Sequence, residues 1–494
     1  MSYPISNSVN NGRPASSSES KSNVEHLEKA GADDTSVQHD RDLRRFDADA
    51  ERKLVRKLDM RIMPALWAMY FLNYLDRSTI AQARLNGLEK HLGLVGSQFN
   101  VCVSILFVGY TVVQIPSNML MSTQKIRPSL WMCGWMMVWA VISACTAVAK
   151  NYSSLVVIRF FLGVAEAPFY PGAIYLLSIF YPRREIATRQ AILYSANIIA
   201  ISFSGLIAAA TFATLDGRGG LFGWQYLFII EGCLTFGIAF IAIFMLPDHP
   251  LTTRWLTQEE RELAQWRMDR DTVGMEPSKG AMAGLKQAIA DGKLWVLVIM
   301  QTLHLASCGF NSFFPTVVSA LGYNSTLTLV LTCPPYLSAG IAAILLAMSS
   351  GKRNERTWHI TLSMLVAIIG FVISCVTLDV GARYTSCFLF CIGAYAANSI
   401  ILGWVSATCG QTQEKKAASL SIVNVFANAS FIYTPYLYPK SDGPKYLTAN
   451  AANASFAFGV AVCAWILKVW LKAENREIRK RSASDGKDRL LFAY

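Results

Sequence analysis

Long apolar stretches separated by short polar segments dominate the chain from about residue 60 onward. Windows of roughly 17 to 25 residues with few charges recur about twelve times. They are centred near residues 71, 109, 139, 166, 202, 235, 306, 338, 368, 397, 428 and 460. Each window is long enough to cross a bilayer as an α-helix. The pattern therefore predicts an all-α integral membrane protein with twelve transmembrane helices.

The spacing of the windows predicts two halves of six helices each. Six windows precede a polar stretch from Pro247 to Asp291 and six follow it, as expected for a parallel repeat. Within that stretch Thr257 can cap a helix and Glu260 can reach back to it, which predicts short amphipathic helices. The predicted domains are a tail over 1–58, helical halves over 59–246 and 292–472, a linker over 247–291 and a second tail over 473–494.

Composition and charge agree with a membrane protein. Of the 494 residues 53% are hydrophobic and only 16% are charged, and the net charge is +12. Because Lys and Arg gather in alternate loops and before the first window, we expect both termini and the linker in the cytoplasm. These loop residues are Lys125, Arg127, Arg183, Arg184, Arg189, Lys352, Arg353, Arg356, Lys415 and Lys416. No stacking platform or known module accompanies them, so nucleic acid is not an expected partner.

The remaining composition narrows the function classes further. Residues 1–40 are rich in Ser, Asn, Asp and Gly and are expected to be disordered, and no cleaved signal is expected. Eleven cysteines fall almost wholly inside windows without metal-ligand spacing, so no disulfide, metal or cofactor is expected. The chain has no Walker loop, Rossmann glycines or nucleophile elbow. Neither an enzyme nor an ATP-driven pump is predicted.

Charged residues enter the apolar windows mainly at two places. LNYLDRST carries Asp76 and Arg77, and IRFFLGVAEAPFYPG carries Arg159 and Glu166. Neighbouring helical residues point about 100° apart, so Asp76 and Arg77 need partners on other helices. Arg159 and Glu166 are seven residues apart and share one helix face, about 10 Å apart along the axis. A charge at the bilayer centre costs from about 2.5 to more than 10 kcal/mol, so these four should face each other or a polar cavity.

Two interpretations of this charged set are open. It either fixes helix packing as an ion-pair cluster or forms a binding site. Small residues and helix breakers crowd the same window and favour a binding site, because they free backbone groups beside a cavity. They are Gly163, Ala165, Ala167, Pro168, Pro171 and Gly172.

Six segments carry a joint pattern: LNYLDRST, VGYTVVQIPSNML, RFFLGVAEAPFYPG, LFGWQYLFIIEG, MLPDHP and NVFANASFIYTPYLYPKSDGPKY. Together, over roughly residues 55 to 475, they resemble the anion:cation symporter family of the major facilitator superfamily. More narrowly, they resemble the fungal allantoate, nicotinate and pantothenate permeases. The loop PSNMLMSTQKIRPSL lacks the acidic residue of the general superfamily motif, a loss that this branch commonly shows. The resemblance implies proton-coupled uptake of a small organic carboxylate by alternating access, in the plasma membrane.

The resemblance also implies roles for individual residues. Asp76 and Glu166 match the proton-coupling acids, with Glu166 as the expected coupling residue. Arg77 and Arg159 match the residues that bind the substrate carboxylate. Further residues resemble the family's cavity lining by position: Tyr74, Tyr110, Gln301, Trp404 and Asn424. Independently, arginine keeps its proton and offers a forked set of donors, which suits a carboxylate.

Several candidates have two interpretations. His304 fits a proton relay or a structural histidine, and Glu231 fits helix packing or a site role. Four aromatic residues fit stacking on an aromatic acid or ordinary core packing: Tyr170, Tyr175, Phe310 and Trp404. The alternatives to uptake are an exporter of a small acidic metabolite or drug and a nutrient sensor that does not transport. The expected partners are the carboxylate, protons and the bilayer, and no oligomer is expected to be required.

Overall fold

The computed structural model describes residues 48–122, 127–272 and 281–485. The predictions for residues 1–40 and for Lys125 lie outside the described residues, as do the side chains of Arg183 and Arg184. The chain divides into two compact units after Leu58. In the first unit, the described part holds an exposed ion pair between Arg52 and Asp49, with 3.3 Å between the charged atoms. Apart from the bounds of α2, whose first residues belong to the first unit, everything that follows concerns the second unit.

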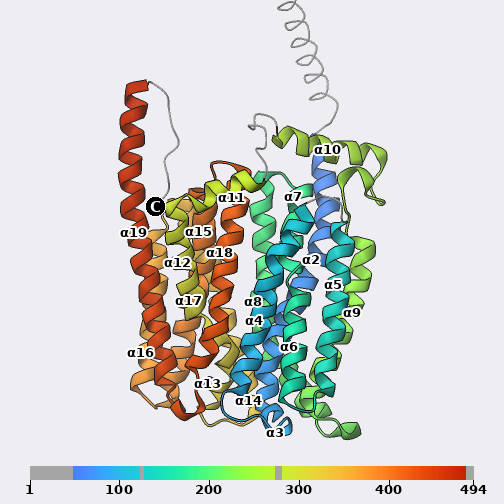
Figure 1. The fold of residues 1–494 in the computed structure, drawn as a ribbon, viewed down its shortest axis with the longest axis vertical. Helices are drawn as coiled ribbons and strands as arrows, with labels where there is room; N and C mark the ends of the chain where they lie inside the picture. Colours follow the sequence, from blue (N-terminus) through green and yellow to red (C-terminus); the bar gives the residue numbers. More distant parts are fainter. Residues whose placement is uncertain (1–47, 123–126, 273–280, 486–494) are drawn as a thin grey trace, which may run out of the picture. The chain divides into compact units, whose positions relative to one another are not determined.

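The described chain is helical, and the helices follow the predicted windows closely (Figure 1). The first half consists of α2 (Ala48–Leu85), α3 (Leu88–His91), α4 (Gln98–Ser122), α5 (Pro128–Cys145), α6 (Tyr152–Glu166), α7 (Phe169–Phe180), α8 (Arg183–Leu215) and α9 (Gly223–Met245). The linker forms α10 (Gln258–Thr272) and α11 (Ala281–Ile289). The second half consists of α12 (Gly292–Ser307), α13 (Phe314–Ser319), α14 (Ser325–Leu331), α15 (Cys333–Arg353), α16 (Thr357–Val376), α17 (Val380–Thr408), α18 (Gln413–Tyr433) and α19 (Leu447–Asp485).

Twelve helical spans account for the predicted windows. Ten stretches of the described chain are long and apolar enough to cross a membrane, and Gln98–Gln114 of α4 is a shorter apolar helix. The twelfth span is α2, whose mean hydropathy is low because its first part, residues 48–61, is rich in charged residues and because Asp76 and Arg77 interrupt its apolar run. The twelve-helix fold in two halves is therefore confirmed.

Three of the spans are each built from two helical pieces. Pro168 lacks a backbone N–H and cannot continue α6, so α6 ends at Glu166 and α7 begins at Phe169. In the second half, a 3-10 turn, η4 (Gly309–Phe313), separates α12 from α13. A break at Thr332 separates α14 from α15, which has proline near its first position. The break after Glu166 leaves this carboxyl at a helix end inside the bundle.

Glycines allow α4 and α6 to touch backbone to backbone. A Cβ atom on Gly163 would lie 2.0 Å from the carbonyl oxygen of Leu106, and one on Gly109 would lie 2.4 Å from that of Phe160. Both distances are too short for any side chain, so only glycine allows this approach. On the other side of α5, Gly232 of α9 packs in the same way on Ala140. These contacts fix the position of α6 relative to its neighbours.

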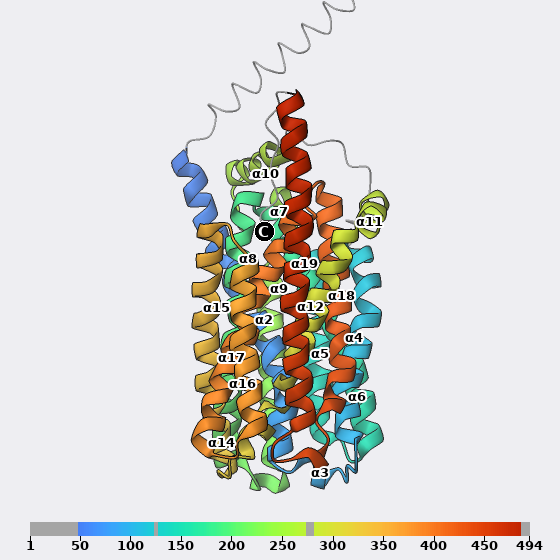
Figure 2. The same ribbon diagram turned by 90° about the vertical axis from the view of Figure 1, so that its left-hand side faces the viewer.

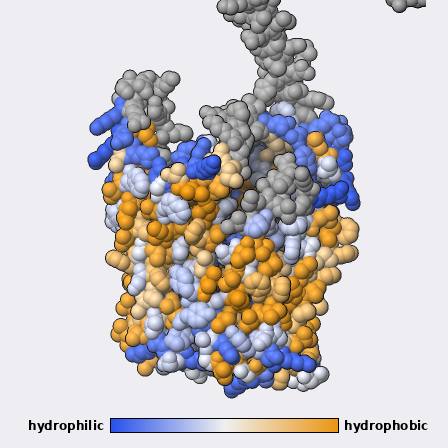
Figure 3. Space-filling model, in the orientation of Figure 1, coloured by the Kyte–Doolittle hydropathy of each residue, from blue (hydrophilic) through white to orange (hydrophobic). Residues whose placement is uncertain are grey.

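The two ends of the helices differ in what joins them. We refer to the end where α10 and α11 lie as the linker end, and to the end with α3, α13 and α14 as the opposite end (Figures 1 and 2). Between these ends, apolar residues cover most of the face seen in Figure 3, whereas polar residues gather toward both ends. This distribution fits a bilayer around the middle of the helices.

The linker begins with the predicted capping box. The backbone N–H of Thr257 donates to Glu260 Oε2 at 2.9 Å, and the N–H of Glu260 donates to Thr257 Oγ1 at 3.3 Å. Because both free N–H groups of the first turn are satisfied, α10 begins at this point. α10 contacts α7, and α11 packs on α18.

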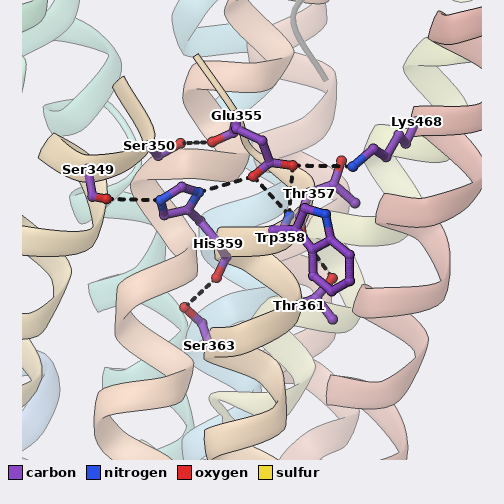
Figure 4. A network of polar contacts seen from close by, with 9 residues as sticks. All are labelled: Ser349, Ser350, Glu355, Thr357, Trp358, His359, Thr361, Ser363 and Lys468. Carbon is purple, nitrogen blue, oxygen red and sulfur yellow. Dashed lines mark hydrogen bonds and ion pairs between the residues drawn. The ribbon is translucent and has the colours of Figure 1, made fainter. Parts of the chain in front are cut away.

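A polar network ties α15, α16 and α19 together at the linker end of the second half (Figure 4). Glu355 lies at its centre and accepts hydrogen bonds from the Trp358 N–H at 3.0 Å and from Lys468 Nζ at 3.4 Å. His359 Nδ1 lies 3.1 Å from Glu355 Oε2, and its Nε2 lies 3.1 Å from Ser349 Oγ. The network links three helices through one loop carboxylate.

At the opposite end, an ion-pair cluster connects the two halves. Glu89 of the first half lies 3.0 Å from Arg84 Nε and 2.5 Å from Lys440 Nζ of the second half. The Arg84 guanidinium also lies 4.4 Å from the ring centre of Phe99 and 5.4 Å from that of Phe313. We refer to Arg84, Glu89, Phe99, Phe313 and Lys440 as the opposite-end cluster.

Candidate functional site

An ion pair joins α2 to α6 in the middle of the first half. Arg77 Nε donates to Glu166 Oε2 at 2.6 Å, and the Glu166 side chain is fully buried. The second carboxyl oxygen of Glu166, Oε1, is buried without a hydrogen-bond partner. Arg77 therefore has its partner on another helix, and half of the carboxyl of Glu166 still has room for a donor.

Arg159 lies on the same helix as Glu166, but its guanidinium has different partners from that of Arg77. Its side chain is 2% exposed, and its Nε donates to the backbone carbonyl of Cys102 at 3.3 Å. Its Nη1 is buried and has no hydrogen-bond partner, and within the described chain Arg159 forms no ion pair. A buried guanidinium without a direct ion-pair partner is costly, because its hydration has been lost. An anionic ligand is the natural group to complete it.

The hydrogen bonds of Asp76 go to α5 and not to the arginines. Its Oδ2 accepts a hydrogen bond from Trp139 Nε1 at 2.5 Å, and its Oδ1 accepts one from the Ser143 hydroxyl. Trp139 can only donate, so the carboxyl of Asp76 is held as an acceptor. Glu166 and Arg159 still act on it electrostatically. Asp76 thus forms part of the wall behind α2, whereas Arg77 faces α6.

Tyrosine rings surround Arg77 on its other sides. The guanidinium lies 4.7 Å from the ring centre of Tyr110 and 5.5 Å from that of Tyr74. Tyr70 packs edge-on against Tyr74 and stacks on Tyr170, with ring centres 5.1 Å and 5.4 Å apart. Cation–π contacts of this kind hold a guanidinium in place without consuming its N–H donors. Two of the predicted lining residues, Tyr74 and Tyr110, are therefore brought together with Arg77.

A buried amide chain connects the two halves at mid-height. Gln301 Nε2 of α12 donates to Asn398 Oδ1 of α17 at 2.9 Å, and Asn398 Nδ2 donates to Tyr194 Oη of α8 at 2.6 Å. Gln301 was expected at the site, whereas Asn398 and Tyr194 were not. The signal for Asn398 was a single amide within a run of small residues, AYAAN, in an otherwise apolar window. Gln301 Oε1 has no hydrogen-bond partner and is buried.

The other predicted residues lie in more ordinary surroundings. Trp404 is fully buried in an apolar cluster with Ile401 and Val405, and its role at the site stays a prediction. The side-chain oxygen of Asn424 accepts a hydrogen bond at 2.9 Å from Asn428 on the same helix. His304 Nε2 lies 2.7 Å from the carbonyl oxygen of Ala394, which fits the structural interpretation.

The site thus combines an arginine paired with Glu166, an arginine without an ion-pair partner in the described chain, a buried carboxyl and a group of tyrosines. An arginine without such a partner can take up a carboxylate or phosphate through two parallel N–H donors.

Comparison with known proteins agrees with the fold. The family model of the Major Facilitator Superfamily matches residues 66–435. A solved structure titled as a bacterial homolog of the human lysosomal transporter Spinster superposes with a TM-score of 0.66 at 15% identity, covering 82% of this chain and 95% of that chain. At this identity the likeness concerns the fold alone.

Curated fungal transporters are similar along most of the chain. The high-affinity nicotinic acid transporter of Saccharomyces cerevisiae is 30% identical over 429 residues, covering 86% of this chain and 79% of that protein. The major facilitator-type transporter hxnP of Emericella nidulans is 31% identical over 447 residues, covering 89% of both chains. A transporter of Schizosaccharomyces pombe is 32% identical over 443 residues, covering 87% of this chain and 85% of that protein. With a family model that spans most of its helices and relatives of this kind, the chain belongs to the major facilitator superfamily of membrane transporters.

Proposed function

We propose that this protein takes up a small organic anion, a carboxylate, together with protons by alternating access. The observation that carries the proposal is that two arginines of the site, one on α2 and one on α6, differ in their ion-pair partners. Arg77 is neutralised by Glu166, whereas Arg159 has no ion pair in the described chain. The similarity to a nicotinic acid transporter supports a carboxylate as the substrate.

Binding would begin at Arg159. A carboxylate placed there accepts the free N–H donors and supplies the missing negative charge. Planar acids would gain further contact from Tyr74 and Tyr110, whose rings lie near Arg77, and from Tyr170, which stacks on Tyr70. A planar carboxylate of the size of nicotinate is the substrate that these groups favour.

Proton coupling would follow from Glu166. When a proton neutralises Glu166, Arg77 loses its partner and becomes a second donor for the anion. Proton binding therefore raises the affinity for the anion, and by thermodynamic linkage the anion raises the affinity for the proton. External acid should then promote uptake. The site with both the proton and the anion bound carries less net charge than the site with only one of them bound.

Orientation follows from the basic loops. Arg127, Lys352 and Arg353 lie at the linker end, so the positive-inside rule supports a cytoplasmic linker end and cytoplasmic termini. The opposite-end cluster would then face outward and keep that side closed in this conformation. The plasma membrane is the location that uptake of an external nutrient requires.

Purified protein in liposomes tests the proposal directly. Labelled nicotinate, allantoate or pantothenate is offered outside under an inward-acid gradient, an outward-acid gradient or none. We expect accumulation above equilibrium only when the outside is more acidic than the lumen. Accumulation that ignores the gradient would exclude proton coupling, and binding without uptake would leave the sensor alternative. In cells, loss of the protein should lower retention of the labelled acid, whereas an exporter would raise it.

Glu166→Gln separates coupling from binding. The amide keeps the size of the side chain but cannot exchange a proton, so gradient-driven accumulation should be abolished. Exchange of labelled for unlabelled substrate needs no net proton movement and should persist in part. Glu259→Gln, at an exposed position of α10, is the matched control and should behave as wild type. Full accumulation by Glu166→Gln would remove Glu166 from the mechanism.

A further inference from the structure

A third buried carboxyl lies behind α2, outside the arginine site. Glu231 of α9 is 2% exposed, and within the described chain no cation lies within ion-pair distance of it. Its hydrogen-bond partner is the hydroxyl of Thr79 on α2. Thr79 follows Asp76 by three residues, so both lie on the same side of α2 and about one turn apart.

The surroundings of Glu231 favour a neutral carboxyl. The hydroxyl of Thr79 donates to Glu231 Oε2 and also lies 3.0 Å from the carbonyl oxygen of Leu75. A hydroxyl has one proton, so Thr79 offers Glu231 at most one donor and no positive charge. An ionised Glu231 would be a buried anion without a cation, which is strongly unfavourable.

Asp76 has different partners one turn away. It accepts from Trp139 and Ser143 of α5, as an ionised carboxylate does. The same α5 surface contacts α9 where Gly232, the residue after Glu231, packs on Ala140. α2, α5 and α9 therefore meet around one ionised and one neutral acid. Asp76 acts electrostatically on Glu231, and two interacting buried carboxyls favour holding a single proton between them, because both cannot be charged at low cost.

The charged groups around Glu231 are few. On α2 the nearest is Asp76, and α6 contributes Arg159 and Glu166 beyond it. The α5 side chains that contact Asp76 are uncharged. At the start of α9, about two turns away, His91 and Asp216 contact Trp224 and Gly223.

We propose that Asp76 and Glu231 form a second proton-binding site, whose proton resides on Glu231 in this conformation and is exchanged during the transport cycle. The proposal rests on the proposed function for its link to transport, but the location of the proton can be tested alone. Transfer from Glu231 to Asp76 moves one proton and leaves the pair with the same net charge. Exchange with water adds or removes that single proton.

Infrared difference spectroscopy of the purified protein in D₂O and H₂O tests the location. Wild type should show a carbonyl band of a protonated carboxylic acid that shifts on deuteration. The band should be absent in Glu231→Gln, whose amide can still accept from Thr79, and retained in Glu474→Gln, a partly exposed control. Thr79→Val keeps the acid but removes its partner, so the band should move in frequency. A band that survives in Glu231→Gln, or that stays unmoved in Thr79→Val, overturns the proposal.

The link to transport is measured by the proton-to-anion ratio, obtained in liposomes from the membrane potential and pH gradient at which flux reverses. Glu231→Gln should transport one proton fewer per anion than wild type. An unchanged ratio together with a lost band would overturn the exchange and leave Glu231 as a permanently neutral acid. If wild type itself ignores pH gradients, the proposed function fails, while the spectroscopic result on Glu231 stands independently.

Discussion

Two arginines with the same chemistry occupy different electrostatic states within one site. Arg77 donates to Glu166 and is surrounded by tyrosine rings, whereas Arg159 has a buried Nη1 without a partner. The first is held in place, and the second is available. Under the proposed function, this inequality would give an order of binding at the residue scale: the anion would reach Arg159 first, and Arg77 would become available only when Glu166 is neutral.

Arg159→Lys should impair both accumulation and exchange of the substrate. Lysine keeps the charge but presents it as a point on a flexible stem, so the two parallel donors are lost. We expect the Kd for the carboxylate to rise by roughly tenfold to a hundredfold, as for one lost charge-assisted hydrogen bond of about 1.5–3 kcal/mol. Calorimetric titration of the protein with the substrate measures this Kd. Arg218→Lys, at an exposed turn before α9, is the control. Wild-type affinity in Arg159→Lys would contradict the assignment.

The identity of the charged residues was predictable from sequence, but their pairing was not. Charge inside an apolar window is rare and expensive, so Asp76, Arg77, Arg159 and Glu166 stand out in the sequence. Which of them meet depends on the rotation of α2 about its axis. That rotation turns Asp76 to Trp139 and Ser143 on α5, contacts that no spacing within one helix encodes. Asn398 and Tyr194 were missed for the same reason.

At the element scale, the close contact of α4 with α6 positions the site. Gly163 touches the backbone of Leu106 and Tyr110, and it lies between Arg159 and Glu166 on α6. The windows and the break at Pro168 could be predicted from the sequence, because apolar length and proline chemistry are local properties. Which two helices would touch depends on the packing of the whole bundle, so it could not be predicted from local sequence.

Gly163→Ala should damage transport by moving α6. The new methyl group would lie 2.0 Å from the Leu106 carbonyl oxygen, so the helices must separate or shift. Overpacking of this kind costs about 1–3 kcal/mol and would move Arg159 and Glu166 together. Thermal unfolding and substrate uptake measure the two effects. Gly134→Ala on α5 meets nothing within 4 Å and should match wild type in both assays. Equal behaviour of the two variants would contradict this account.

Glu355 at the linker end stabilises the second half in a pH-dependent way. Burial alone would raise the pKa of Glu355, but hydrogen bonds from the Trp358 N–H, His359 and Lys468 outweigh burial and lower that pKa below its ordinary value. The stabilisation is therefore present above the unfolded pKa, near 4.3, and is lost as pH falls through the lower folded pKa. The contribution of Glu355 to the free energy of unfolding should therefore be larger at neutral pH than at acidic pH.

Glu355→Gln should lower the free energy of unfolding by about 1 kcal/mol at pH 7, because Lys468 loses its counter-charge. The difference from wild type should shrink below about pH 4, where Glu355 itself becomes protonated. Thermal unfolding in detergent across this pH range measures it, with Glu259→Gln as the control. If the difference in free energy of unfolding between wild type and Glu355→Gln does not change with pH, packing and not charge holds the three helices together.

At the scale of the whole helical unit, the two halves are joined at the opposite end by the opposite-end cluster. Lys440 brings the loop before α19 to Glu89, and the backbone carbonyl of Pro435 accepts a hydrogen bond from Asn100 Nδ2 at 3.0 Å. Under the proposed alternating access, these contacts would have to separate once in every cycle. Their strength would then set how often the opposite end opens.

Lys440→Glu should raise the fraction of molecules open at the opposite end. It places two carboxylates against each other, and a loss of about 1 kcal/mol shifts the equilibrium roughly fivefold. In a background with Cys308 as the sole cysteine, a thiol reagent that cannot cross membranes should label that buried residue faster from outside. Lys90→Glu, exposed at the same end, serves as the control. Unchanged labelling would mean that the ion pairs do not restrain opening.

The break in the fourth span has a mechanical consequence. α6 ends at Glu166 and α7 begins at Phe169, so the helix is interrupted beside the carboxyl that the proton would occupy. Glycines hold α6 against α4, whereas α7 also contacts α8 and α10. Under the proposed function, a change of charge on Glu166 would therefore act at the point where the span passes from one set of neighbouring helices to another.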